Sequence, residues 1–244
     1  MKYLLTIEAR MRSSRLPGKV LKPILGKPML ARMIERLKYA RTVDGIVVAT
    51  TVNPDDDPIV NLAQEANVGV FRGSEEDVLA RVLGAARRYS ADVIVETTGD
   101  CPLIDPAIVD KVVSDYRMGG ADFVSNNLVY TTPRGMDVRV FSTAKLAEID
   151  SITDDPADRE HVSLYFWEHP DKYQLRNVTT ELAPEIANLR LTVDTKEDFE
   201  LIRKVFEALY SEDSIFNFAD IVNLFDRNPD LSQINQNIMQ KPVR

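Results

Sequence analysis

The chain of 244 residues contains one cysteine and two histidines, and it has no long hydrophobic run. A single cysteine excludes an internal disulfide framework, and so few thiols and imidazoles leave no cluster for a structural zinc. The apolar runs stay well short of the roughly 18 residues that a membrane-spanning helix needs. We therefore expect no membrane association, and oxygen ligands for any metal that the protein uses.

The sequence also lacks a recognisable targeting signal and an overall positive charge. The apolar stretch within Met1–Glu8 is too short for a signal-peptide core, and arginines follow it without a small-residue cleavage site. The formal net charge of −8 argues against general affinity for nucleic acid. These observations predict a cytoplasmic protein with no nucleic-acid partner.

Basic residues are concentrated at one end, because residues 1–41 hold eleven Lys and Arg but only two acids. We expect four of these cations on the solvated face of a helix: Arg32, Arg36, Lys38 and Arg41. Four others follow an apolar strand, in a loop that contains Pro17 and Gly18: Arg10, Arg12, Arg15 and Lys19. Such a loop can direct several cations and backbone N–H groups at one anion, which predicts a phosphate-binding loop.

The first half of the chain alternates short apolar runs with amphipathic helical patterns, which predicts an α/β fold with a parallel sheet. The expected strands are 3–7, 45–50, 68–71, 92–96 and 122–124. Helices are expected to begin at Pro28 and end near residue 40, at Asp57-Pro58, at a capping box formed by Ser74 and Asp77, and at Asp105-Pro106.

In the second half, strands and helices no longer alternate regularly, although no linker marks a domain boundary. We expect strands at 137–141, 173–178 and 189–193, and helices from Ser142, over 155–168, from Thr195 to about 210, and over 218–225. The polar tail from 228 is expected to pack loosely or on a partner subunit. We divide this single domain into a nucleotide-binding half (1–125), an acceptor-binding and dimerisation half (126–226) and a tail (227–244).

Each of two aspartates follows an apolar strand. Asp100 comes after Val93–Thr98 in a Gly-Asp turn, and Asp194 comes just before a capped helix. Ligands of open α/β sheets bind at the carboxyl ends of the strands, which is also where the basic loop must lie. Carboxylates beside a triphosphate suit Mg²⁺, and without metal we expect each to be under-compensated. The alternative is that Asp100 only caps its turn and that Asp194, like Glu197 and Asp198, only serves the helix start.

The basic loop has neither the glycines of the GxGxxG motif nor those of the Walker A motif. This argues against a dinucleotide-binding loop and against a P-loop. Together with other motifs it resembles the CMP-sugar synthetase superfamily, which includes the CMP-Kdo and acylneuraminate cytidylyltransferases, and most of all the type of spore-coat polysaccharide biosynthesis protein F. The motifs are residues 9–19 (Ala-Arg-Met-x-Ser-Ser-Arg-Leu-Pro-Gly-Lys), 26–30, 47–51, 71–79, 99–104, 135–138, 159–162, 193–195 and the tail. The likeness runs in order along essentially the whole chain. Arg12 departs from it, because this branch usually has glycine there, and its role stays open.

The resemblance implies a Rossmann-like nucleotidyltransferase fold and transfer of CMP from CTP to an acceptor, with Mg²⁺ and release of pyrophosphate. It also implies a homodimer. Carried over by motif position, the phosphates would be held by Arg10, Arg15 and Lys19, and the backbone of Ala9 would approach the nucleotide. Asp100 and Asp194 would bind the metal. The candidates for reading cytosine are Arg72, Ser74 and Asp77, of which the last two have the alternative role of a capping pair.

The turn-rich segment 126–168 is expected to line the acceptor pocket, with four candidate residues: Arg134, Asp137, Arg159 and His161. An acidic sugar would need a cation there, and Arg134 and Arg159 can form a bidentate carboxylate clamp. His161 is either a general base for the attacking hydroxyl or a core or interface residue.

The sequence thus predicts a cytidylyltransferase that acts on a 3-deoxy-2-keto sugar acid for a surface polysaccharide. One alternative within the enzyme class is a sugar-phosphate or phosphonate nucleotidylyltransferase, because the nucleotide-binding half would serve any of these acceptors. Outside the enzyme class, the alternative is a regulatory nucleotide-binding module without catalysis. The presence of both Asp100 and Asp194 argues against that module.

Overall fold

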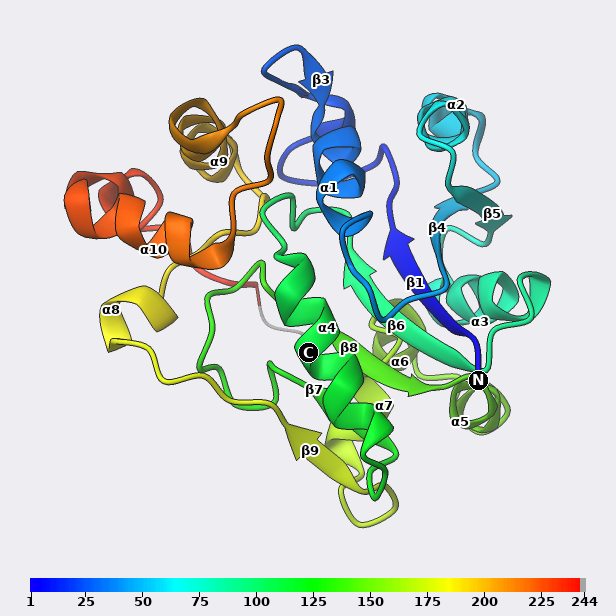
Figure 1. Cartoon of the computed structure of the whole chain (residues 1–244). Coiled ribbons are helices and arrows are strands. Elements are labelled where there is room, and N and C mark those ends of the chain that lie inside the picture. Colours follow the sequence, from blue (N-terminus) through cyan, green and yellow to red (C-terminus); the bar gives the residue numbers. More distant parts are fainter. Residues whose placement is uncertain (242–244) are drawn as a thin grey trace.

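In a computed structural model, which describes residues 1–241, a seven-stranded sheet has the order β5-β4-β1-β6-β8-β7-β9 (Figure 1). Strands β1, β4, β5 and β6 are parallel neighbours, β8 runs antiparallel to β6 and β7, and β9 is parallel to β7. Their bounds are β1 Tyr3–Glu8, β4 Gly45–Thr51, β5 Gly69–Gly73, β6 Val93–Thr98, β7 Phe123–Ser125, β8 Arg139–Ser142 and β9 Leu175–Asn177. The predicted α/β class with a mostly parallel sheet is confirmed.

Helices cover both faces of the sheet, and α1 and α4 lie in front of it in Figure 1. The α-helices up to residue 150 are α1 Met29–Leu37, α2 Asp57–Glu65, α3 Val78–Arg88, α4 Pro106–Arg117 and α5 Thr143–Asp150. Short elements between them are Lys19–Leu21 and Pro54–Asp56, both 3-10 helices, and a hairpin of β2 Pro23–Ile24 and β3 Lys27–Pro28. The predicted capping box of Ser74 is wrong, because Asp77 itself is the N-cap and accepts a hydrogen bond from the Ala80 N–H.

Two hydrophobic cores lie on opposite faces of the sheet because side chains alternate along each strand. On β1, Leu5 and Ile7 join the core under α1, α2, α4 and α9, whereas Leu4 joins the core under α3, α5 and α7. Burial on both faces explains why the central strands read as nearly continuous apolar runs. Across the described residues, no helix combines the length and the hydropathy needed to cross a bilayer.

The second half departs from the sequence expectations at two places. The helix predicted over 155–168 is broken into α6 (Pro156–Glu160) and α7 (Leu164–Glu168). The strand predicted at 189–193 is absent, apart from one isolated bridge between Arg134 and Arg190. That segment is fixed instead by hydrogen bonds from the Leu191 N–H to the Arg134 carbonyl and from the Val193 N–H to the Asp100 carbonyl. The pattern of apolar residues in this segment cannot distinguish a strand from an extended segment that is held by single hydrogen bonds.

The C-terminal third ends in helices that pack on the same edge of the sheet as the basic loop. They are α8 Pro184–Ala187, α9 Lys196–Leu209 and α10 Phe218–Arg227, followed by a 3-10 helix at Pro229–Ile234. Thr195 and Asp198 form a capping box at the start of α9, as the sequence suggested. Part of the tail packs firmly, contrary to expectation, because Asn235 is 4% exposed and donates hydrogen bonds to the Arg190 carbonyl and to Asp198. Most other described residues of the tail are exposed, and packing on a partner subunit stays a prediction.

The N-terminal cations are not all on a solvated face, which corrects a second expectation. Arg32 and Arg36 are each 3% exposed. Arg36 donates to the carbonyls of Leu103, Ile104 and Phe216 at 3.2, 3.1 and 3.0 Å. Burial lowers the pKa of its guanidinium to about 10, which keeps it charged at neutral pH.

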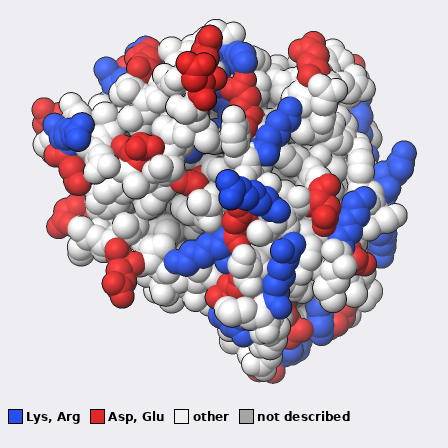
Figure 2. Space-filling model, viewed as in Figure 1, with Lys and Arg blue, Asp and Glu red and all other residues white. Residues whose placement is uncertain are grey.

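On the face shown in Figure 2, basic and acidic side chains are interspersed.

Replacing Arg36 with Met should destabilise the protein, because three buried carbonyl oxygens lose their donor. Each unsatisfied buried group costs about 1–3 kcal/mol, so the free energy of unfolding is expected to fall by about 3 kcal/mol in urea denaturation. Arg41→Met is the matched control, since Arg41 is exposed, and should change it by less than about 0.5 kcal/mol. Equal effects of the two substitutions would contradict a structural role for Arg36.

Candidate active site

The basic loop after β1 is held in shape by the carboxylate of Asp56, which is 1% exposed. This carboxylate accepts hydrogen bonds from the Met11 N–H at 2.7 Å and from the N–H and hydroxyl of Thr51. The loop closes where the Gly18 N–H donates to the Met11 carbonyl, with Gly18 at φ 68° in the left-handed region that glycine tolerates. The closure turns Lys19 back toward the end of β6.

The ammonium group of Lys19 joins Asp100, in the turn after β6, to Asp194, which lies just before α9. Its Nζ donates to Asp100 Oδ2 at 3.0 Å, to Asp194 Oδ1 at 3.1 Å and to the Val193 carbonyl at 2.7 Å, and its side chain is 12% exposed. Burial opposes its charge, but the two carboxylates raise the pKa of Lys19 above its ordinary value. Burial likewise opposes the charge of Asp100, yet Lys19 and the Thr98 hydroxyl lower its pKa to about 2. The sequence expectation that these three groups meet at one sheet edge describes their placement correctly.

Asp194 is surrounded by cations, so the expectation of under-compensated carboxylates is wrong. Arg15 lies 2.9 Å from its Oδ2, and Arg190 lies 2.6 Å from the same oxygen. Arg190 also pairs with Asp198, which is fully buried and therefore does more than start a helix. The sequence reasoning missed Arg190, because residues four apart in the predicted strand would be about 13 Å from each other and could not pair.

The residues around Lys19 fit a Mg²⁺ ion of the kind held by nucleotide phosphates. Two carboxylates, Asp100 and Asp194, converge on a single cation, and Mg²⁺ usually takes one or two carboxylates and completes its shell with phosphate oxygens and water. Residues 1–241 contain no group of three or more His, Cys, Asp or Glu that would form an all-protein metal cage. The adjacent Cys101 is buried, and burial beside Asp100 raises the pKa of its thiol, so it packs rather than reacts.

The other predicted nucleotide-binding residues lie along the ends of β1, β4 and β5. Ala9 is buried beneath the turn that carries Asp100. Arg10 donates to the Glu75 carbonyl at 3.1 Å and lies 3.8 Å from Glu160. Arg72 pairs with Asp57 and donates to backbone carbonyls after β4, while Ser74 is exposed. Arg12 is exposed and pairs with Asp55 and Glu75.

The predicted acceptor residues are distributed over separate contacts. Arg159 pairs with both Asp77 and Asp150, which ties α6 to the start of α3. Arg134 lies over the ring of Tyr130 at 4.0 Å and donates to its hydroxyl. The two guanidiniums therefore have no partner in common, and a joint carboxylate clamp stays a prediction. Asp137 accepts a hydrogen bond from the Gly135 N–H.

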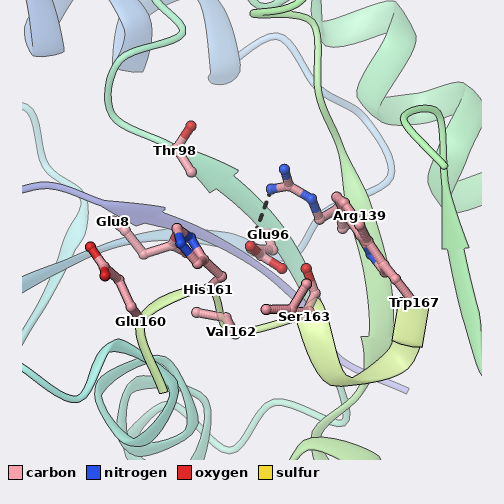
Figure 3. A pocket seen from close by; sticks show the side chains of 10 residues that line it. Glu8, Glu96, Thr98, Arg139, Glu160, His161, Val162, Ser163 and Trp167 are labelled. Carbon is pink, nitrogen blue, oxygen red and sulfur yellow. Dashed lines mark hydrogen bonds and ion pairs between the residues drawn. The ribbon is translucent and has the colours of Figure 1, made fainter. Parts of the chain in front are cut away.

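A cavity of about 120 Å³ opens beside Asp100 (Figure 3). Its lining includes Glu8, Glu96, Arg139, His161 and Trp167. Thr98 connects this cavity to the aspartate, because it lines the cavity and donates to Asp100 Oδ1 at 2.6 Å. His161 is exposed at the break between α6 and α7, so it is not the core residue of the alternative interpretation.

Three lining residues escaped the sequence reasoning: Glu8, Glu96 and Arg139. The sequence does mark the two glutamates, because Glu8 ends one buried apolar strand and Glu96 lies within another. Aspartate and glutamate are rarely buried in such strands unless a partner balances their charge.

The fold and this site define a nucleotidyltransferase. A family model described as cytidylyltransferase matches residues 4–233, and the chain belongs to that family. The resemblance found in the motifs is thereby confirmed.

Individual relatives agree with this assignment. Spore coat polysaccharide biosynthesis protein SpsF of Bacillus subtilis is 32% identical over 93% of this chain and 95% of its own length. The 3-deoxy-manno-octulosonate cytidylyltransferase of Geobacter metallireducens is 32% identical over 72% of this chain and 75% of its own. The solved structure of a cytidylyltransferase from Leptospira borgpetersenii serovar Hardjo-bovis matches with a TM-score of 0.90 and 38% identity, covering 98% of this chain and 100% of that one.

Replacing Lys19 with Met should remove a stabilising contribution that depends on pH. The pKa of Asp100 is about 2 in the folded protein against an ordinary 3.8. A carboxylate with a depressed pKa stabilises the fold above about pH 4 and loses that contribution as the pH falls toward 2. We therefore expect the variant to be less stable than the wild type by about 2 kcal/mol at neutral pH, and the difference to vanish near pH 2.

Urea denaturation across this pH range measures the difference. Lys196→Met serves as the control, since Lys196 is exposed. A difference between wild type and Lys19→Met that stays constant from neutral pH to pH 2 would show that Lys19 does not act through Asp100.

Proposed function

We propose that the protein transfers CMP from CTP to the hydroxyl of a 3-deoxy-2-keto sugar acid used in a surface polysaccharide. The observation that carries the proposal is the meeting of Lys19, Asp100 and Asp194 at the end of the parallel strands, beside a loop rich in arginine. Membership of the cytidylyltransferase family supports the use of CTP. The names of relatives in the spore coat polysaccharide and octulosonate groups support the acceptor class.

In this reaction the acceptor hydroxyl gives up its proton, for which His161 is the candidate base, and its oxygen forms a bond to the α-phosphorus of CTP. The bond from the α-phosphorus to the oxygen that bridges to the β-phosphate breaks, and pyrophosphate leaves. Arg10, Arg15 and Lys19 would bind the phosphates and stabilise the charge that develops on the leaving group. Asp100 and Asp194 would hold Mg²⁺, which when bound neutralises phosphate charge. The backbone of Ala9 would approach the nucleotide.

Further roles follow from the position of the remaining candidates. Arg72 near the end of β5, with Ser74 and Asp77 just after it, would read the cytosine. The acceptor would lie toward Arg134, Asp137, Arg159 and His161, in the half of the chain that forms one wall of the cavity beside Asp100. We also propose a homodimer, with its interface in the turn-rich segment 126–226.

The base preference follows directly from the proposal. With a competent acceptor, kcat/KM measured by pyrophosphate release should be highest for CTP among CTP, UTP, ATP and GTP. A sugar phosphate and a phosphonate belong in the acceptor panel, because turnover of either in place of a sugar acid would replace the proposed acceptor class. A preference for a purine triphosphate would contradict the cytidylyl assignment.

Asp100→Asn should lower kcat by about a hundredfold, the scale of losing one preorganised charge contact. It should also raise the Mg²⁺ concentration needed for half-maximal rate, because the ion loses one anionic ligand. Asp194→Asn should behave similarly, and the double variant should lose little more than the worse single one, as expected for residues that act as a unit.

Asp226→Asn, at an exposed position, is the control for these variants and should leave the rate and its metal dependence unchanged. Full activity of Asp194→Asn at limiting Mg²⁺ would remove Asp194 from the metal site and leave Asp100 as the remaining candidate ligand.

A further inference from the structure

Two acids face the cavity beside Asp100 from neighbouring strands. Glu8 ends β1 and Glu96 lies on β6, where Thr6 is the register partner of Glu96 and Thr98 that of Glu8. Both glutamates therefore project from the same face of the sheet, two residues apart in register. Glu96 is 3% exposed, and both line the cavity (Figure 3).

These carboxylates have fewer partners than their burial requires. Among the described residues, no well-formed hydrogen bond reaches the buried Oε1 of Glu8 or the buried Oε2 of Glu96. The Ser163 hydroxyl lies beside the Glu96 carboxylate and favours its charged form. Nε1 of Trp167, on the cavity wall, likewise has no acceptor. Unsatisfied polar atoms at this depth are rare in folded proteins and usually mark a place for a ligand or water.

Negative charge predominates in the lining. Arg139 is its single guanidinium and lies 3.2 Å from Glu96 Oε1, while Glu8, Glu96 and Glu160 contribute carboxylates. Burial, followed by repulsion from Glu96, raises the pKa of Glu8 well above its ordinary value.

The charged groups that act on Glu8 are Glu96, Asp100, Arg139 and Arg81. Arg81 is outside the lining and donates instead to the Ser74 carbonyl. An anionic group entering this cavity would meet repulsion, and a purely apolar one would leave the carboxylate oxygens unsatisfied.

We propose that the acceptor carries a protonated amine that binds between Glu8 and Glu96. An ammonium group brings a positive charge and up to three donors, which is what the two unpartnered oxygens lack. Trp167 supplies a flat wall and a free donor for a sugar ring. The inference rests on the proposed function and narrows its substrate class to an amino sugar acid.

The size and place of the cavity agree with this assignment. Its 120 Å³ lie below the roughly 300–1,000 Å³ of common ligand pockets, so it accepts one end of a sugar and not a nucleotide. Because Thr98 both lines the cavity and bonds Asp100, a sugar anchored there extends toward the proposed CTP phosphates. The sugar's carboxylate would then lie outside the acidic lining.

Calorimetric binding of simple amino sugars tests the proposal without any turnover. The probes are glucosamine, galactosamine and mannosamine, each compared with its N-acetyl derivative and its parent hexose. At least one free amine should bind about tenfold or more tighter than both neutral counterparts, the scale of a charge-assisted hydrogen bond. Equal affinity of amines and neutral sugars would overturn the proposal.

Variants locate the site of any preference. Glu8→Gln and Glu96→Gln should each abolish the advantage of the amine, whereas Glu65→Gln, at an exposed position on α2, should preserve it. Thermal denaturation accompanies each variant. If Glu96→Gln fails to fold because Arg139 loses its partner, Glu8→Gln decides, since Glu8 makes no ion pair to lose. A preference that survives in folded Glu8→Gln would overturn the proposal.

Failure of this inference can be told apart from failure of the proposed function. Binding of CTP is measured separately by the same calorimetry, and sugar acids with and without a free amine are compared by pyrophosphate release. If CTP binds and acids without an amine react equally well, the cytidylyltransferase proposal stands and the amine inference fails. If an amine binds through Glu8 but CTP does not bind, the proposed function fails and the cavity assignment stands.

Discussion

One ammonium group, that of Lys19, holds together three loops that are far apart in the sequence. It bonds the turn after β6 through Asp100 and the segment before α9 through Val193 and Asp194. A nearly buried ion pair is weak evidence for stability, because desolvation offsets much of its attraction. Its value here is geometric, since a cation that both carboxylates share fixes where they point. Arg15 and Arg190 add two further cations around Asp194.

Buried guanidiniums stabilise the loops around this centre in a similar way. Arg36 donates to the backbone carbonyls of Leu103 and Ile104, just after the turn of Asp100, and Arg190 joins Asp194 to the start of α9 through Asp198. The carbonyl groups of loops at a sheet edge have no neighbouring strand to bond to. The N–H groups of an arginine guanidinium supply the missing hydrogen bonds. A rigid parallel sheet with loops fixed by arginine explains how a site made of irregular backbone keeps its geometry.

The site has two electrostatic halves, which meet at Thr98. On one side Lys19 and the arginines would bind the proposed CTP phosphates, and on the other side Glu8 and Glu96 line a cavity whose carboxylates would repel them. In the proposed reaction this polarity would keep the triphosphate out of the acceptor cavity and orient an amine-bearing acceptor before chemistry. Both glutamates stand on strands, so the scaffold itself sets their position.

The sequence by itself determined the α/β class, the main strands, most helix starts, and the meeting of Lys19 and Asp100 at one edge of the sheet. It could do so because periodicity and capping are local properties, and because parallel strands must end at a common edge. Only the tertiary structure decided that Arg36 is buried, that the segment 189–193 is not a strand, that Asn235 in the tail packs beside Asp198, and that Glu8 and Glu96 share a cavity. Each of these outcomes depends on a partner that lies dozens of residues away in the chain, and no local pattern of residues records which partner a buried charge will meet.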